Sequence, residues 1–256
     1  SILKLAVLPN AFMIAPELRA AIQTKLQHGG RTVAWVYAPG IFGGGCRDGP
    51  CTPDLQAASQ LVGMPLRMNS TVAVPLETTF APAPGLLPPS LAGSSYGADL
   101  GEVAPWLSCD GADRATVLGH YGAAAGRKPS ACMSHEASHT SVFIGAPRPP
   151  LALWRALALN AGVHLYTSES ESADNGLAVR ADAVTYGASA LLYHAGASAG
   201  GAVQAGRRRQ VTLPQKLAVK SEWGEDVCTS AQPCDSFSTP ALQDGESVLY
   251  WLSSDR

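Results

Sequence analysis

One short motif has the residue types and spacing of a catalytic metal site: His135-Glu136-x-x-His139. On a helix, histidines four residues apart lie on one face and bind zinc, while the glutamate acts as a general base on zinc-bound water. The flanking residues oppose a helix, because Pro129 lies just upstream and residues 140–144 have the composition of a strand. We therefore expect a turn with solvated side chains, and a zinc-dependent hydrolase is the alternative.

Other reactive side chains lack some of the partner residues that catalysis would require. Cys132 and His135 could form a nucleophile and its base, but no orienting group or activating helix terminus accompanies them. Glu169, Glu171 and Asp174 could supply the two carboxylates of a glycosidase. These acidic residues lie in a serine-rich segment typical of a surface turn, so we expect solvated charges there.

Aromatic side chains in loops offer a different kind of site, a flat surface on which a sugar ring stacks. Trp106 and Trp223 are the candidates for such a platform, which gives a carbohydrate-binding module as a second alternative. Trp35, Tyr37 and Trp154 lie in apolar segments, and we expect them to pack in a core or between domains.

The six cysteines give three candidate disulfide pairs: Cys46–Cys51, Cys109–Cys132 and Cys228–Cys234. The first and third pairs enclose short segments with proline and small residues, typical of loops closed by a disulfide, and the second pair is what remains. Neither short pair has the spacing or the neighbouring histidines of a tetrahedral zinc site. Six reduced thiols are the alternative.

Asn69-Ser70-Thr71 is a sequon for N-glycosylation. Together with the even number of cysteines, it predicts a protein of the extracellular space or the secretory pathway. The sequence shows no signal peptide and begins at Ser1 rather than at methionine. We therefore expect a processed product or a fragment of a longer polypeptide.

The composition excludes several classes of protein. With 256 residues, 46% hydrophobic and 15% charged, the chain is long and apolar enough to bury a core. The net charge of −2 gives no excess of basic residues that would bind nucleic acid, and the basic run 207–209 is too short to provide one. The apolar stretch 151–159 is interrupted by Arg155 and is too short to cross a membrane. The glycine run 43–45 lacks the lysine of a phosphate loop, and we expect no cofactor.

The framework that positions these groups begins as an α/β structure. Residues 3–8 and 32–37 are apolar runs typical of buried strands, and each is ended by a proline. Between them a helix begins at Pro16 and ends at Gly29, with one apolar stripe on its surface. This order predicts a βαβ unit with a parallel sheet.

Later segments extend this pattern and then change it. A strand at 140–144, a helix at 151–160 and a strand at 163–166 predict a second βαβ unit. Residues 43–101 are expected to be rich in loops, and 116–118 to form a short strand. Short strands without helices then predict an antiparallel tail, at residues 177–180, 190–194, 210–213, 217–219 and 247–252.

An ordered series of segments resembles a known family; they lie at residues 5–22, 28–40, 115–121, 141–147, 153–166, 190–195, 211–214 and 245–252. The series resembles the class I glutamine-amidotransferase-like domain of secreted glycoside hydrolases, in particular the trimerisation domain of family 42 β-galactosidases. The resemblance implies a flavodoxin-like or amidotransferase-like three-layer α/β sandwich with a mainly parallel sheet at residues 1–200. A small antiparallel β-rich tail would follow at 201–256, and the family's first strand and helix would precede Ser1.

The resemblance also implies where a nucleophile would stand. In catalytic members of the wider fold a cysteine lies in a Gly-x-Cys-x-Gly turn after a strand, and a helix N-terminus lowers its pKa. The comparable turn here is Tyr37-Ala38-Pro39-Gly40, with Ala38 at the place of the nucleophile. Pro39 removes an N–H that could serve an oxyanion hole, and His194 begins no His-x-Glu partner pair.

The sequence therefore predicts a non-catalytic accessory or assembly domain of a larger secreted carbohydrate-active or cell-surface protein. The expected partners are a neighbouring domain of the same polypeptide, for which the resemblance implies a (β/α)8 barrel, further copies of the chain, or a glycan. We expect no nucleic-acid or membrane partner and no enzyme activity from this chain alone.

Overall fold

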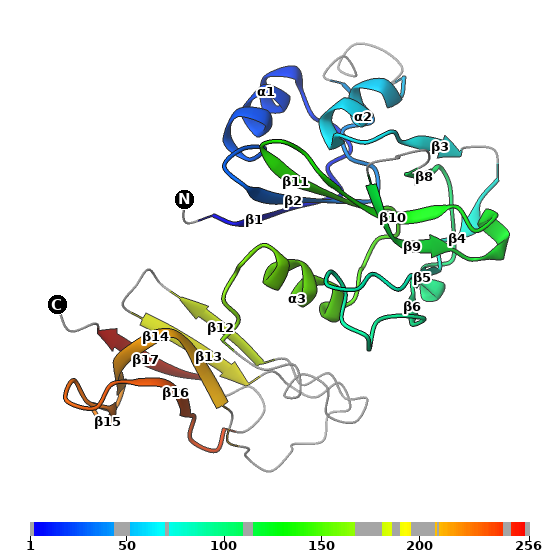
Figure 1. Ribbon diagram of the computed structural model, residues 1–256. Helices are drawn as coiled ribbons and strands as arrows, with labels where there is room; N and C mark the ends of the chain where they lie inside the picture. The colour runs from blue at the N-terminus through cyan, green and yellow to red at the C-terminus, as the bar shows by residue number, and fades with distance from the viewer. Residues whose placement is uncertain are drawn as a thin grey trace. The chain divides into compact units, whose positions relative to one another are not determined.

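The computed structural model divides the chain into two compact units, Ser1–Val163 (unit 1) and His164–Arg256 (unit 2) (Figure 1). The described residues are 3–43, 52–69, 72–109, 115–166, 181–185, 190–195, 208, 210–242 and 247–253. Among them strands predominate and helices are few. The division falls after Val163 and not after residue 200 as expected, because the strand Ala190–Ala195 pairs with the strand Ser247–Ser253 of unit 2.

Unit 1 is organised around a seven-stranded sheet with the order β1-β2-β11-β10-β9-β5-β6. Its strands are β1 (Leu5–Pro9), β2 (Arg31–Val36), β5 (Thr78–Phe80), β6 (Ser95–Tyr96), β9 (Ala115–Tyr121), β10 (Pro129–His135) and β11 (His139–Ile144). Strands β1, β2 and β11 run parallel, and the remaining neighbours pair antiparallel. The sheet is therefore mixed and not mainly parallel as expected, because the β10–β11 hairpin reverses the chain beside the parallel strands.

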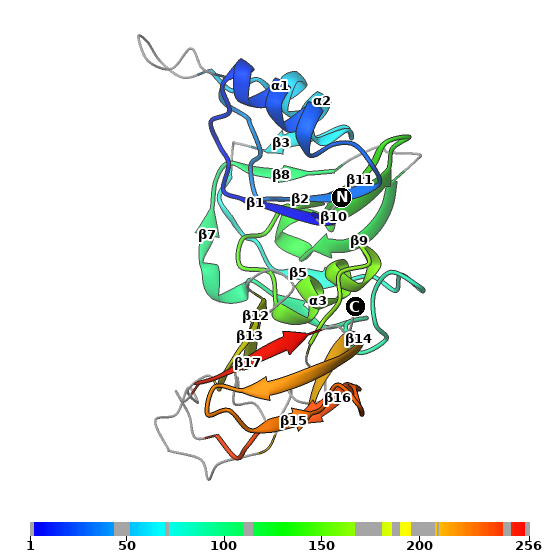
Figure 2. The same ribbon diagram turned by 90° about the vertical axis from the view of Figure 1, so that its left-hand side faces the viewer.

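Three helices cover the two faces of this sheet: α1 (Pro16–Lys25), α2 (Leu55–Val62) and α3 (Leu151–Asn160). Helices α1 and α2 lie over one face and α3 lies over the other (Figures 1 and 2). Helix α2 forms in a segment expected to be loop: Asp54 caps it by accepting a hydrogen bond from the Ala57 N–H at 2.9 Å, and Gly63 ends it at φ 77°. None of the described helices is both long and apolar enough to cross a bilayer.

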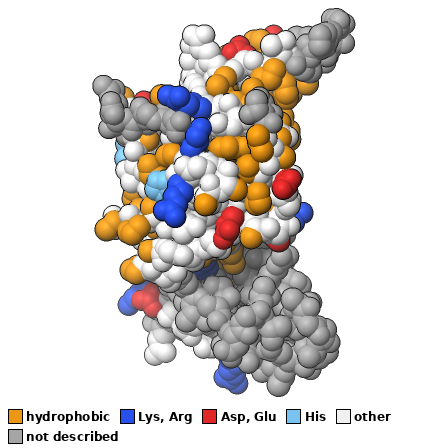
Figure 3. Space-filling model, turned by 90° about the vertical axis from the view of Figure 1, so that its right-hand side faces the viewer, with side chains coloured by type: hydrophobic (Ala, Val, Ile, Leu, Met, Phe, Trp, Pro, Cys, Tyr) orange, Lys and Arg blue, Asp and Glu red, His pale blue; other side chains and the backbone are white. Residues whose placement is uncertain are grey.

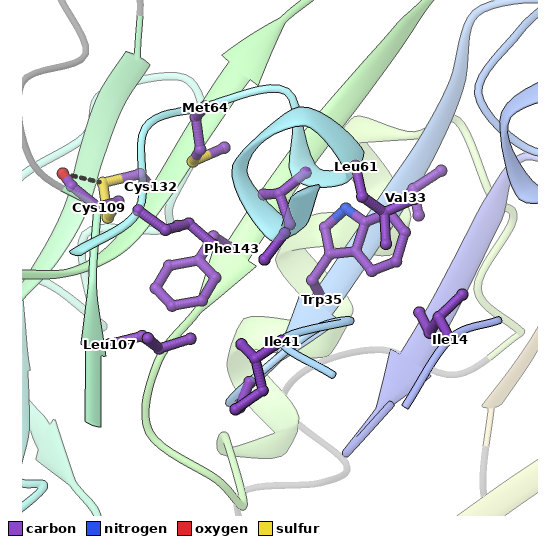
Figure 4. Packing of buried hydrophobic residues seen from close by; sticks show 14 of the residues in the cluster. Ile14, Val33, Trp35, Ile41, Leu61, Met64, Leu107, Cys109, Cys132 and Phe143 are labelled. Carbon is purple, nitrogen blue, oxygen red and sulfur yellow. Dashed lines mark hydrogen bonds between the residues drawn. A yellow bond between two sulfur atoms is a disulfide. The ribbon is translucent and has the colours of Figure 1, made fainter. Parts of the chain in front are cut away.

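Two hydrophobic cores fill the space between the sheet and its helices. The core under α1 and α2 contains Trp35 and Phe143, both fully buried, together with the Cys109–Cys132 disulfide (Figure 4). The core on the α3 side contains Val142 and Leu157. Because successive strand residues point to opposite faces, the neighbours Val142 and Phe143 of β11 belong to different cores. Unit 1 is thus a three-layer, sandwich-like α/β structure.

The connection between α2 and β9 contains short elements that residue patterns did not predict. They are the strands β3 (Arg67–Asn69), β4 (Val74–Pro75), β7 (Glu102–Val103) and β8 (Trp106–Ser108) and the short 3-10 helix η2 (Ala98–Leu100). A second short 3-10 helix, η3 (Ala123–Ala125), follows β9. Strand β3 pairs with β8 and β4 with β7, both antiparallel. Runs of two or three residues are too short to carry a period, so their formation depends on pairing partners distant in the sequence.

Unit 2 is an antiparallel structure, as expected for the tail, with the strand order β12-β13-β17-β14-β15 and with β16 paired to β14. Its strands are β12 (Ala181–Thr185), β13 (Ala190–Ala195), β14 (Gln210–Ser221), β15 (Asp226–Cys228), β16 (Cys234–Ser238) and β17 (Ser247–Ser253). One face of this sheet carries a hydrophobic core that includes Val219, Phe237 and Tyr250.

Two strand predictions for this part of the chain need correction. The segments 210–213 and 217–219 form the single strand β14, which accommodates a register shift against β16. Residues 163–166 form no strand; instead the carbonyl oxygen of Tyr166 accepts a hydrogen bond from the Thr212 N–H at 2.9 Å. The second βαβ unit is therefore wrong, because the chain passes from α3 into unit 2. The strand expected at 177–180 lies outside the described residues.

The surface carries few charges, in keeping with a composition of 15% charged residues. On the face drawn in Figure 3, Lys and Arg side chains form a short row, Asp and Glu are scattered, and hydrophobic side chains occupy a broad area.

Candidate functional site

The backbone is strained at the turn that follows β2. Tyr37 has a φ of 69°, in the left-handed region that residues other than glycine rarely adopt. A strained residue directly after a strand is the geometry that presents a nucleophile in hydrolases. The Tyr37 N–H donates to the Ile144 carbonyl oxygen at 2.7 Å, which holds the turn against the end of β11. The strained position is thus Tyr37, one residue before Ala38.

The side chain of Tyr37 is also held in place. Its hydroxyl donates a hydrogen bond to the carbonyl oxygen of Pro105 at 2.6 Å. Its ring meets the ring of Phe12 edge-on, with the ring centres 5.5 Å apart. Burial raises the pKa of the Tyr37 phenol, so the group stays protonated and serves as a donor.

The rest of the turn is packed into the core under α1 and α2. Ala38 is 2% exposed and belongs to that core. Gly40 has a φ of 58°, and a Cβ added there would lie 3.0 Å from Leu61 Cδ2, so only glycine fits without strain. The Gly40 N–H donates to the Ala11 carbonyl oxygen at 2.7 Å. Neither Ala38, Pro39 nor Gly40 carries a nucleophilic atom.

Arg19 ties this turn to both helices on its face of the sheet. From α1 its guanidinium donates hydrogen bonds to the carbonyl oxygens of Ile14 at 3.2 Å, of Ala57 at 2.7 Å, and of Gly40. A half-buried cation with three carbonyl acceptors has a structural role. No residue pattern indicates this role, because an arginine on an amphipathic helix is ordinarily solvated.

Left-handed residues gather at one edge of the parallel strands. Asn10 follows β1 with φ 50°, Tyr37 follows β2, and Arg148 lies beyond β11 with φ 57°. In open α/β sheets, ligands bind outside the carboxyl ends of the strands, which is this edge. Arg148 is exposed and its guanidinium lies 3.9 Å from the Asp99 carboxylate. These side chains supply aromatic rings and an ion pair, and they include neither a thiol nor a histidine.

Each of the four described cysteines belongs to a disulfide. Cys109 and Cys132 are joined with a Cα–Cα distance of 6.4 Å, and Cys228 and Cys234 with one of 5.9 Å. Cys132 therefore has no thiol to pair with His135 as nucleophile and base. The third candidate pair, Cys46 and Cys51, lies outside the described residues.

The His135-Glu136-x-x-His139 motif lies in the β10–β11 hairpin and not on a helix. His135 ends β10, His139 begins β11, and the Glu136 N–H donates to the His139 carbonyl oxygen at 2.9 Å. The Ser134 hydroxyl donates to Glu136 Oε1 at 2.7 Å, and His135 and Glu136 are exposed. This is the turn that the flanking residues indicated. Among the residues that the structure describes, no three metal-binding side chains gather.

The hairpin and the turn after β2 lie at opposite ends of the parallel strands. His139 pairs with Arg31 at the beginning of β2, and Tyr37 follows the end of that strand. Six residues of strand span roughly 20 Å. The histidines of the motif are therefore too far from Tyr37 to act on a group bound there.

Asn69, the candidate glycosylation site, turns its amide inward. It ends β3 opposite Trp106, and its Oδ1 accepts a hydrogen bond from Lys128 Nζ at 3.0 Å. Its Nδ2, the atom that would carry a glycan, is buried. The Lys128 ammonium also lies 5.7 Å from the centre of the Trp106 ring. This geometry opposes a glycan on Asn69 in the folded protein.

The two tryptophans proposed as sugar platforms differ in exposure. Trp106 is 5% exposed, and its indole N–H donates to the Val72 carbonyl oxygen at 3.3 Å, so it cannot offer a ring face to a sugar. Trp223 is 62% exposed. Trp251 of β17 is 53% exposed and was missed in the sequence, because an apolar strand does not reveal which face is covered.

Some sequence candidates lie outside the described residues: Glu169, Glu171, Asp174, Gly44, Gly45, Arg207 and Arg209. His164 is described, and its Nε2 lies 2.8 Å from the carbonyl oxygen of Thr212, a contact that serves packing in unit 2. Its role is therefore the structural one.

Comparison with known proteins shows what this fold is similar to. No protein-family model and no curated protein sequence matches the chain. Two solved structures of Gan42B, a GH42 β-galactosidase from G. stearothermophilus, are similar in fold, one of them being a catalytic mutant. Each has a TM-score of 0.51 and 14% sequence identity, and the matches cover 97% and 98% of this chain.

The matches extend over both units but not over the whole of the known protein. They cover 31% and 32% of the Gan42B chains, so this chain spans about a third of their length. At 14% identity the likeness shows the fold alone. It establishes a fold related to part of a GH42 β-galactosidase chain, in agreement with the family that the sequence resembles.

Proposed function

We propose that this chain is a non-catalytic accessory domain of a larger secreted carbohydrate-active protein and that it acts through packing and assembly. The observation that carries the proposal is the turn after β2, where Ala38 is buried and Tyr37 occupies the strained position with its hydroxyl tethered. The fold's likeness to part of a GH42 β-galactosidase supports the carbohydrate-active setting. Unit 1 would correspond to an amidotransferase-like trimerisation domain, and unit 2 to the β-rich tail that follows it.

The two disulfides support a location outside the cytosol. Disulfides persist in the extracellular space and along the secretory pathway, whereas cytosolic thiols are kept reduced. Both described pairs, Cys109–Cys132 and Cys228–Cys234, are closed. The partners proposed here are a neighbouring domain of the same polypeptide, with a (β/α)8 barrel as its expected form, and further copies of the chain.

The first test asks whether the chain catalyses the reaction of a glutamine amidotransferase or of a glycoside hydrolase. Purified protein is incubated with glutamine and with a panel of nitrophenyl glycosides, and ammonia and nitrophenol release are measured. We expect no release above buffer. Turnover that scales with protein concentration, and that a substitution at Tyr37 or Arg148 abolishes, would contradict the proposal.

The second test concerns assembly. Sedimentation velocity over a wide concentration range gives the mass of the species present. A discrete oligomer supports a role in assembly through copies of this chain. A monomer at every concentration would remove self-assembly from the proposal and leave docking to another domain as the assembly role.

A further inference from the structure

We infer that the outer face of the unit 2 sheet binds a neutral glycan, with Trp251 and Trp223 as its aromatic contacts. The choice of a carbohydrate as the ligand rests on the proposed function, which places the chain in a carbohydrate-active protein. The inference adds to that function a recognition role that packing and assembly do not require.

The position of Trp251 is the first observation. Strand β17 is the middle strand of the order β12-β13-β17-β14-β15. Tyr250 is 1% exposed in the core, and the next residue, Trp251, is 53% exposed on the opposite face. In a half-buried antiparallel sheet the outward positions are ordinarily polar. An exposed indole on the middle strand, at a position that is ordinarily polar, is therefore a candidate ligand contact.

The groups around this indole form hydrogen bonds readily. Lys220 of β14 is the cross-strand partner of Trp251, and such partners share a face of the sheet. Two residues on, Glu222 pairs with Leu249: its N–H donates to the Leu249 carbonyl oxygen at 2.9 Å, and its carboxylate accepts from the Leu249 N–H at 3.4 Å. Trp223 follows directly and is 62% exposed. An ammonium and a carboxylate thus lie on the strand end beside Trp251, and Trp223 follows the carboxylate in the sequence.

The area of this apolar surface selects the kind of partner. An indole offers roughly 200 Å², so the two rings together expose on the order of 230 Å². A stable protein interface needs about 800 Å² from each partner. The only other large hydrophobic side chain described as exposed in unit 2 is Val227. Among the described residues, this apolar area is too small for a stable protein partner, whereas a pyranose ring stacks on a single indole.

The charges point in the same direction. Lys220 is the cross-strand partner of Asp226 in β15 as well as of Trp251, so with Glu222 this part of the face carries one ammonium and two carboxylates, an excess of acidic groups that opposes a polyanion. The ammonium donates hydrogen bonds and the carboxylates accept them, which matches the hydroxyl groups of an uncharged sugar. A neutral polysaccharide fits both the aromatic and the polar parts of this face.

Affinity electrophoresis of the full chain tests the inference. Native gels contain one soluble neutral polysaccharide each: galactan, arabinan, xylan or hydroxyethylcellulose. We expect at least one polymer to retard the protein, and Trp251→Ala to weaken that binding about tenfold or more. Trp251→Phe, which keeps a ring, should retain most of the binding, and Trp223→Ala should weaken it. Leu159→Ala is the matched control, because Leu159 is 60% exposed on α3 of unit 1.

Three outcomes would overturn the inference, once thermal melts show that each variant is folded. They are no retardation by any of the four polymers, equal retardation of Trp251→Ala and the unchanged chain, and self-association that Trp251→Ala relieves without any retardation. The proposed function is tested separately, by the glutamine and glycoside assays. A chain that is inactive and binds no glycan overturns this inference alone.

Discussion

The guanidinium of Arg19 in α1 donates a hydrogen bond to the carbonyl oxygen of Gly40, at the end of the turn after β2. The same side chain reaches the carbonyl oxygen of Ala57 in α2 at 2.7 Å. One residue therefore fixes the turn against two helices that are distant in the sequence. The shape of the candidate site depends on this contact and needs no bound ligand.

Removal of the Arg19 side chain should destabilise unit 1. Arg19→Ala leaves three partly buried carbonyl oxygens without their donor, and we expect a loss of about 2 kcal/mol in the free energy of unfolding. Equilibrium urea denaturation measures this loss. Arg148→Ala is the control, because its side chain is 77% exposed and should contribute little. Equal effects of the two substitutions would contradict the role given to Arg19.

Gly40→Ala should be more destabilising than alanine at another left-handed glycine. A Cβ at Gly40 meets Leu61 at 3.0 Å, whereas one at Gly85, with φ 78°, meets nothing within 4 Å. Gly85→Ala therefore reports the backbone strain, about 1 kcal/mol, and Gly40→Ala adds the steric clash to it. Thermal or urea unfolding compares the two variants. If Gly85→Ala costs as much as Gly40→Ala, the contact with Leu61 is unimportant.

His139 should make the protein less stable in mild acid. Burial lowers its pKa below the ordinary 6.5, and the Glu136 carboxylate offsets only part of that shift. As the pH falls through 6.5 the unfolded chain binds a proton that the folded chain does not, so the free energy of unfolding decreases. Urea denaturation between about pH 7.5 and 5.5 measures the slope. His139→Gln should flatten it, and an unchanged slope in that variant would contradict the role given to His139.

Asn69 should carry no glycan in the folded protein. Its Nδ2 is buried and its Oδ1 is engaged by Lys128, so an attached sugar would have to displace the end of β3. Secretion from a glycosylating host, followed by peptide mass spectrometry, should find Asn69 unmodified. Thr71→Ala, which removes the sequon, should change the mass only by the difference between the two side chains and should leave the yield unchanged. Stoichiometric glycan on a natively folded chain would contradict the buried position of this amide.

The sequence predicted the long elements well and the topology of the sheet poorly. The strands around Trp35 and Phe143 and the helix Leu151–Asn160 carry strong periodic or β-branched patterns, and each formed near its expected place. Strand β10 was missed, because its residues Pro129–His135 mix small and polar types. A prediction that lacks β10 also lacks the β10–β11 hairpin, and β11 is then expected to be one more strand of a parallel sheet.

The turn at Ala38 could be located in the sequence, but its geometry could not. Residue identity alone shows that this turn contains no cysteine, and its correspondence to a nucleophile position stays a prediction. The sequence did not reveal that Tyr37 carries the positive φ, because backbone strain of that kind follows from tertiary contacts. It also could not reveal Arg19 or Trp251, whose environments are created by residues far away in the chain.

Placing a reactive thiol in this turn would take more than one substitution. Cysteine in place of Tyr37 would remove the hydroxyl that binds Pro105 and the ring that meets Phe12. Cysteine in place of Ala38 would lie in a sealed interior that neither water nor substrate enters. Hydrolytic chemistry here would first require an opened cavity, because the core under α1 and α2 encloses Ala38 and the contacts of Tyr37 hold its ring and hydroxyl in place.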